Sequence, residues 1–204
     1  MRARRRSRTA LTIVACIGDS ITAGSPLWDP DPVVRDGIGT PDERSQWEWW
    51  AARSHPGFEF RNHGVCGERT DEIAARFDDA VRGGASSLVV QGGINDVVQA
   101  RPVEEAARNL AGMVERGRRL GLRVALADVL PWNNGDLRAA TDITRLNTLI
   151  RTIADGLDVP LLPFHDTLVD PARQHRMRDE WTDDGNHPSV EGHRLLGERA
   201  FRQP

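Results

Sequence analysis

The sequence predicts an α/β fold in which a five-stranded parallel sheet lies between two layers of helices, a three-layer α/β/α sandwich. Three observations predict it. Short apolar runs alternate with longer segments of helical periodicity, there are five such runs, and the first (residues 11–17) is apolar almost throughout, as expected for a strand buried on both faces. The chain has 204 residues, the length of one domain. We expect a basic tail over residues 1–9 and a single domain over residues 10–204.

The strands follow from the apolar runs. In chain order, they are expected at residues 11–17, 58–60, 87–90, 122–127 and 159–163. The last run contains Pro160 and Pro163, which cannot donate to a neighbouring strand, so we place it at an edge of the sheet.

Helices are expected between the strands. They are a short helix around Trp47 and Trp50, one from Thr70 to Val81, one from Pro102 to Gly121, one from Ile143 to Gly156, and a last one around residues 190–196. Both Trp47 and Trp50 are assigned to the core. The segment from Ser25 to Glu43 is rich in proline and glycine and has no periodicity, and long loops of this kind in compact domains are often functional. We expect it to form a wall of the site.

Charge and composition exclude several classes of protein. All 27 basic residues are arginine, and five of them lie in the first eight positions, so 30 acidic residues dominate the remainder. An acidic body argues against nucleic-acid binding. No apolar run approaches the ~20 residues of a membrane-spanning helix, and no signal-peptide cleavage site follows the basic arm, so we expect a cytoplasmic protein without membrane insertion. The two cysteines, Cys16 and Cys66, are expected to be reduced thiols in the core.

Polar residues follow the expected strands at the points where ligands gather in such sheets. Gly18-Asp19-Ser20 follows the first strand, Asn62-His63-Gly64 follows the second, Asn95-Asp96 follows the third, and Asp184 and His187 stand in a turn near the C-terminus. A serine nucleophile needs a base, a group that orients the base, and donors for the oxyanion. Singly, each of these motifs is more often a turn or a helix cap. Their common position at one rim of the sheet favours a catalytic set.

These motifs resemble those of the GDSL/SGNH hydrolases, and the resemblance extends from Ile17 to about Gly192. Four blocks carry it: Gly18-Asp19-Ser20-Ile21-Thr22, the block with Asn62, Gly64 and Gly67, Gly93-Ile94-Asn95-Asp96, and Asp184-Gly185-Asn186-His187-Pro188. The resemblance implies a flavodoxin-like SGNH hydrolase fold. It also implies that Ser20 is the nucleophile, His187 the base and Asp184 its partner. The implied oxyanion donors are the backbone N–H groups of Ser20 and Gly64 and the side-chain amide of Asn95.

The expected activity is hydrolysis of carboxylic esters through an acyl-serine, without cofactor or metal, on a small-molecule ester. No pair of the six histidines has zinc-ligand spacing with a third partner. Short acyl groups such as acetyl are favoured because no long apolar lid helix is visible. Candidate substrate-pocket residues are Asp19, Trp28, Trp132 and Trp181. Alternatives are an acyltransferase, a lysophospholipase or thioesterase acting at the same site, and a non-catalytic ligand-binding module.

Overall fold

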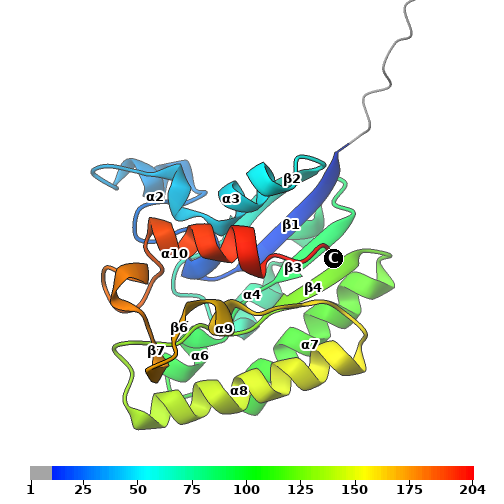
Figure 1. Cartoon of the computed structure of the whole chain (residues 1–204). Helices are drawn as coiled ribbons and strands as arrows, with labels where there is room; N and C mark the ends of the chain where they lie inside the picture. The colour runs from blue at the N-terminus through cyan, green and yellow to red at the C-terminus, as the bar shows by residue number, and fades with distance from the viewer. Residues whose placement is uncertain (1–10) are drawn as a thin grey trace, which may run out of the picture.

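The computed structural model describes residues 11–204, and its centre is one parallel sheet with strand order β2-β1-β3-β4-β5 (Figure 1). In chain order, the strands are β1 (Thr12–Gly18), β2 (Phe58–Gly64), β3 (Ser87–Val90), β4 (Arg123–Ala127) and β5 (Leu161–Leu162). This confirms the predicted α/β class, the parallel sheet and the edge position of the proline-flanked strand. The predicted basic tail lies outside the described residues.

The helices alternate with the strands. They are α1 (Ser20–Ala23), α2 (Pro32–Asp36), α3 (Trp47–Ser54), α4 (Thr70–Ala75), α5 (Phe77–Val81), α6 (Ile94–Val98), α7 (Val103–Arg119), α8 (Leu137–Gly156), α9 (Phe164–Leu168) and α10 (Val190–Leu195), with helical turns η1 (Glu43–Ser45), η2 (Asp179–Trp181) and η3 (Leu196–Ala200). Two short antiparallel strands, β6 (Val169–Asp170) and β7 (Arg173–Met177), form a separate hairpin. The hairpin, α1, α2, α6 and α9 were not predicted from the sequence.

Alternate residues of the central strands enter two different cores. In β1, Ala15 and Ile17 join the core under α4, α5, α7 and α8, whereas Val14 and Cys16 join the core under α3, α9 and α10. Figure 1 shows α7 and α8 covering one face and α10 crossing the other. The sheet is therefore buried on both faces, which explains why its strands are continuous apolar runs. Trp47 is fully buried in the second core, as predicted.

The helix predicted over residues 70–81 is wrong in one respect, because it is interrupted at Arg76. The backbone of Arg76 leaves the helical region (φ −101°, ψ 13°), so α4 and α5 are separate helices. The guanidinium of Arg76 is hydrogen-bonded to backbone carbonyls at the ends of β1 and β2. Periodicity placed Ile73 and Phe77 correctly in the core but gave no sign of this break.

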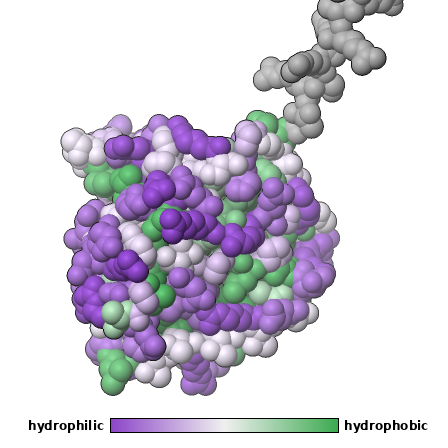
Figure 2. All heavy atoms as spheres, in the orientation of Figure 1, coloured by the Kyte–Doolittle hydropathy of each residue, from purple (hydrophilic) through white to green (hydrophobic). Residues whose placement is uncertain are grey.

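The segment Ser25 to Glu43 does not form a wall of the site, contrary to expectation, because it folds back on itself. The N–H of Asp42 donates to the carbonyl of Leu27 at 2.8 Å, and Trp28 stacks with Arg35. Its helix α2 exposes Val33 and Val34. Figure 2 shows mainly hydrophilic residues on the face seen in Figure 1, with apolar residues in separate small patches, one of them at the upper left where α2 lies.

The strand register brings the carboxyl ends of β1, β2 and β3 together. Gly18 pairs with Gly64, and Ile17 pairs with both His63 and Val90. The chain order reverses between β1 and β3, and ligands of open α/β sheets bind at such a crevice. The loops after these three strands therefore meet at one place.

Candidate active site

The ring of His187 lies between Ser20 and Asp184, within hydrogen-bond distance of each. Nε2 of His187 lies 3.1 Å from Oγ of Ser20, and Nδ1 of the same ring lies 2.7 Å from Oδ2 of Asp184. Ser20 is the first residue of α1 and stands at the carboxyl end of β1, whereas the other two share the turn before α10. A base that contacts both a hydroxyl and an orienting carboxylate is the arrangement that activates a serine.

The Asp184 carboxylate is fixed by three donors. Its Oδ1 accepts hydrogen bonds from the backbone N–H groups of Asn186 and His187, each at 2.8 Å, and its Oδ2 faces the His187 ring. Partial burial works to raise the pKa of Asp184, but the hydrogen bonds from His187 and Asn186 outweigh it and lower the pKa. Asp184 therefore stays ionised beside the imidazole.

The loop after β4 holds the turn that carries Asp184 and His187. The indole Nε1 of Trp132 donates to Oδ1 of Asn186 at 2.6 Å. The Asn134 amide donates to the same oxygen and to the carbonyl of Asp184, both at 2.8 Å. These bonds fix the position of the base relative to the sheet.

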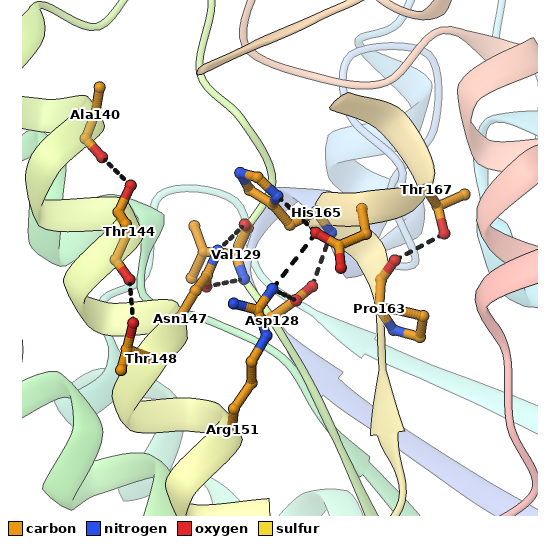
Figure 3. A network of polar contacts seen from close by, with 11 residues as sticks. Asp128, Val129, Ala140, Thr144, Asn147, Thr148, Arg151, Pro163, His165 and Thr167 are labelled. Carbon is orange, nitrogen blue, oxygen red and sulfur yellow. Dashed lines mark hydrogen bonds and ion pairs between the residues drawn. The ribbon is translucent and has the colours of Figure 1, made fainter. Parts of the chain in front are cut away.

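The first residues of that loop, Asp128 and Val129, are held by the hydrogen-bond network in Figure 3. The Asn147 side chain exchanges two hydrogen bonds with the backbone of Val129, each at 2.8 Å. Beside it, the buried Asp128 accepts from the backbone N–H of His165 at 2.7 Å and lies 3.3 Å from Arg151. The network joins the end of β4 to α8 and α9, and it therefore fixes the position of the start of the loop.

Asp19 was predicted as a pocket residue, and this is wrong, because its side chain is fully buried beneath the nucleophile. Its Oδ1 accepts from the N–H of Ile21 at 2.9 Å and caps α1, while Oδ2 accepts from the Gln91 amide at 3.1 Å. Burial raises the pKa of Asp19 to about 6. Gln91 also accepts from the Thr22 hydroxyl at 2.8 Å, so β3 holds the first turn of α1 in place.

The structure contradicts Gly64 as an oxyanion donor. Its backbone N–H already donates to Oδ1 of Asn62 at 2.8 Å, and the residue is buried against α1. A Cβ at this position would lie 2.0 Å from the backbone nitrogen of Ala23. Gly64 is therefore a glycine because β2 and α1 approach closely there, and its N–H is not free for a substrate.

Gly67, three residues further on, has the properties expected of a donor. It lines the same pocket as Ser20, has φ of +83°, and its N–H meets no acceptor among residues 11–204. Within the same residues the Ser20 N–H also meets no acceptor, as expected at the start of a helix. Asn95 lines the pocket too, and its amide donates to the Glu68 carbonyl at 2.9 Å, which leaves its second N–H available.

The pocket beside Ser20 has a volume of about 270 Å³. It is lined by Ser20, Ile21, Cys66, Gly67, Ile94, Asn95, Val98, Trp132, Asn186 and His187. Of the three predicted pocket tryptophans, only Trp132 lies there. Trp28 stacks on Arg35, and Trp181 packs against the core with Arg178 over its ring, so both assignments are wrong.

The sequence interpretation also missed three features of the pocket. Cys66 was assigned to the core but is exposed and lines the pocket, whereas Cys16 is buried as predicted, and both are free thiols. Gly67 was recognised only as part of the glycine block. Its position in a turn just before the helix at Thr70 was the sequence feature that could have indicated a free backbone N–H. Two apolar residues of the lining, Ile94 and Val98, belong to α6, an element that was not predicted.

None of the helices within residues 11–204 is long and apolar enough to cross a membrane. Within the same range, no three histidine, cysteine, aspartate or glutamate side chains gather in a way that would hold a metal ion.

Comparison with known proteins identifies the family. Residues 16–195 match the GDSL-like Lipase/Acylhydrolase family. The chain belongs to this family. A serine–histidine–aspartate triad and an oxyanion hole are typical of it, and its members are hydrolases, so the chain is a hydrolase in that general sense. The comparison with curated proteins found no match.

Solved structures of the family share the fold. A candidate lipolytic protein of the G-D-S-L family from Desulfitobacterium hafniense superposes with a TM-score of 0.76 at 23% identity, covering 92% of this chain and 96% of that one. A member of the lipolytic G-D-S-L family from Veillonella parvula gives a TM-score of 0.73 at 20% identity, covering 92% and 94%. At these identities the likeness carries the fold alone, so the chemistry must come from this chain's own site.

Proposed function

We propose that this hydrolase cleaves carboxylic esters with short acyl groups through an acyl-serine intermediate. The observation that carries the proposal is the contact of His187 with both Ser20 and Asp184, at 3.1 and 2.7 Å, on the wall of an open pocket. A binding module would not need a serine paired with a base that is itself oriented by a carboxylate. This geometry therefore favours catalysis over the binding-module alternative.

The reaction follows from the positions of these groups. The Ser20 hydroxyl attacks the ester carbonyl carbon as His187 takes its proton, and Asp184 stabilises the imidazolium. The N–H groups of Ser20 and Gly67 and the free N–H of Asn95 stabilise the negative oxygen. The tetrahedral species collapses to acyl-Ser20 and expels the alcohol, which takes the proton from His187. Water then attacks the acyl group with His187 as base, releasing the carboxylic acid and restoring Ser20.

The preference for short acyl groups is argued from the pocket. A volume of about 270 Å³ must hold the acyl group together with the ester atoms and part of the alcohol. Ile21, Ile94 and Val98 provide an apolar wall for a small hydrocarbon group. Burying each CH₂ of a longer chain is worth roughly 0.8 kcal/mol only where such a wall continues. We therefore expect kcat/KM to stop rising beyond a few carbons.

The test compares p-nitrophenyl acetate, butyrate and octanoate with the wild-type protein and Ser20→Ala. We expect turnover of acetate and butyrate, weaker turnover of octanoate, and loss of activity in the variant. Turnover that survives Ser20→Ala would refute the nucleophile assignment. A kcat/KM that rises steadily to octanoate would refute the short-chain preference and favour a lysophospholipase or thioesterase. Acyl transfer to an added alcohol, in preference to water, would identify an acyltransferase.

A further inference from the structure

Arg76 is a mostly buried arginine that stands at the break between α4 and α5, behind the pocket. Its side chain is 21% exposed, and that of its partner Glu68 is 20% exposed. Neither side chain lines the pocket that holds Ser20. Burying a guanidinium costs free energy unless its N–H donors are hydrogen-bonded, so Arg76 needs acceptors close to it.

The guanidinium of Arg76 joins three segments of the site. Nη2 donates to the carbonyl of Gly18 at 2.7 Å, two residues before the nucleophile at the end of β1. Nη1 donates to the carbonyl of His63 at 2.5 Å, near the end of β2. Nε donates to Oε2 of Glu68 at 2.6 Å, in the turn that follows Gly67.

Glu68 carries this connection onward to Asn95. Its carboxylate accepts from Arg76, and its backbone carbonyl accepts the Asn95 side-chain amide at 2.9 Å. The Gly67 N–H belongs to the residue directly before Glu68. The positions of two proposed oxyanion donors, and of the backbone that precedes Ser20, therefore depend on one side chain.

We propose that Arg76 is a positioning residue of the oxyanion site. It fixes the Gly67–Glu68 turn, and through it the Asn95 amide, at a set distance from Ser20. This inference rests on the proposed esterase function. It assigns Arg76 no contact with substrate, and the ion pair with Glu68 neutralises its charge.

Lysine should not replace Arg76. The three acceptors lie on three different segments, and the planar guanidinium presents divergent N–H donors from Nε, Nη1 and Nη2. An ammonium group on a flexible stem has no fixed arrangement of donors that matches them. The helix is interrupted at Arg76, and the side chain of this residue reaches the ends of β1 and β2.

The test measures kcat and KM for p-nitrophenyl acetate in Arg76→Gln, Asn95→Asp and the double variant. Misplacing a catalytic group by about 1 Å can cost of the order of 100-fold in rate, so we expect kcat of Arg76→Gln to fall about 10- to 100-fold with KM changed less than threefold. Because part of the effect of Arg76 is exerted through Asn95, the double variant should lose less than tenfold more than Asn95→Asp alone. Added guanidinium ion should restore part of the activity of Arg76→Ala, and methylammonium should not.

Controls separate this role from a purely structural one. Arg82→Gln, at an exposed position after α5 where the arginine pairs with Asp79, should match the wild type. If Arg76→Gln does not fold, Glu68→Ala serves instead, because it removes only the ion pair between Arg76 and Glu68. It should show the same fall in kcat and the same non-additivity with Asn95→Asp. Fully multiplicative losses, or wild-type kcat in Arg76→Gln or Glu68→Ala, would overturn the inference. Absence of esterase activity in the wild type would instead refute the proposed function.

Discussion

At the scale of single residues, the oxyanion site is defined by which N–H groups lack an internal partner. The Gly64 N–H is occupied by the Asn62 side chain, whereas those of Ser20 and Gly67 meet no acceptor among residues 11–204. Free donors that are fixed in place before the reaction stabilise developing charge without reorganisation. Both free groups belong to residues that line one pocket with Asn95.

The contribution of Asn95 can be tested by a change that keeps its shape. Asn95→Asp removes the free amide donor and places a carboxylate facing the oxyanion. We expect kcat for p-nitrophenyl acetate to fall by about 10²–10³-fold or more, with a much smaller change in KM. Gln174→Glu, an amide-to-carboxylate change at an exposed position of β7, is the control. A kcat within threefold of the wild type in Asn95→Asp would contradict the oxyanion assignment.

Cys66 offers a chemical probe of the same pocket. It is exposed beside Gly67, whereas Cys16 is fully buried and burial raises the pKa of its thiol, which makes it unreactive. We expect iodoacetamide to modify one thiol and to lower esterase activity at least tenfold, because the adduct occupies the pocket. Cys66→Ser should be resistant. Full activity in protein with modified Cys66 would show that this side of the pocket does not hold substrate.

At the scale of elements, β2 and the turn after it perform different tasks, and their two glycines separate them. A methyl group at Gly64 would collide with the backbone of α1, whereas one at Gly67 meets no atom within 4 Å but lies on a residue with φ of +83°. We therefore expect Gly64→Ala to lower the free energy of unfolding by about 3 kcal/mol or more, and to lower Tm accordingly. Gly67→Ala should cost only about 1–2 kcal/mol from its backbone.

Activity should follow the opposite order in the protein that remains folded. Gly67→Ala places a methyl group in the pocket and strains the turn that carries the donor, so its kcat/KM should fall about tenfold or more per folded molecule. The measurements are thermal unfolding and kcat/KM corrected for the folded fraction. A stable Gly64→Ala with impaired catalysis, beside a fully active Gly67→Ala, would restore Gly64 as the donor.

Much of the fold could be predicted because periodicity reports burial. The apolar run before Gly18 correctly indicated a strand buried on both faces, and the prolines around β5 correctly indicated an edge. The elements that were missed are short: α1, α2, α6, α9, β6 and β7 contain two to five residues each. Elements of that length have too few positions to show a period.

The candidate site was predicted in part, for a related reason. The motifs placed Ser20, Asp184 and His187 correctly within reach of one another. They did not distinguish Gly64 from Gly67, because a sequence does not show which backbone N–H is already paired. The tryptophans were equally ambiguous, since an indole that covers a core and one that lines a pocket have the same local pattern. Only Trp132, held by Asn186, faces the pocket.

At the scale of the whole molecule, buried carboxyl groups make stability depend on pH. Glu48 is 3% exposed, and its carboxyl oxygens have no partner among the described residues. Burial raises its pKa well above the ordinary value, and burial raises the pKa of Asp19 and of Asp128 to about 6. Between about pH 4 and these raised values, the folded protein holds protons that the unfolded chain has released. These groups therefore lower stability as the pH rises through that window.

Glu48→Gln tests this effect at the group with the strongest burial. The variant cannot release a proton, so its Tm relative to the wild type should increase as the pH is raised from about 4.5 to 7.5. Glu115→Gln, an exposed change on α7, should keep the wild-type pH dependence. The measurement is thermal unfolding at several pH values in buffers of equal ionic strength. Parallel curves for Glu48→Gln and the wild type would refute this account.

Covalent trapping can show whether Ser20 is a nucleophile activated by His187. The wild-type protein is treated with diethyl p-nitrophenyl phosphate, and released p-nitrophenolate, intact mass and the modified peptide are measured. The structure predicts one diethylphosphoryl group per chain, on Ser20, with loss of esterase activity and no adduct in Ser20→Ala. An adduct on another residue would contradict this assignment of the nucleophile. So would hydrolysis of p-nitrophenyl acetate by the Ser20→Ala variant.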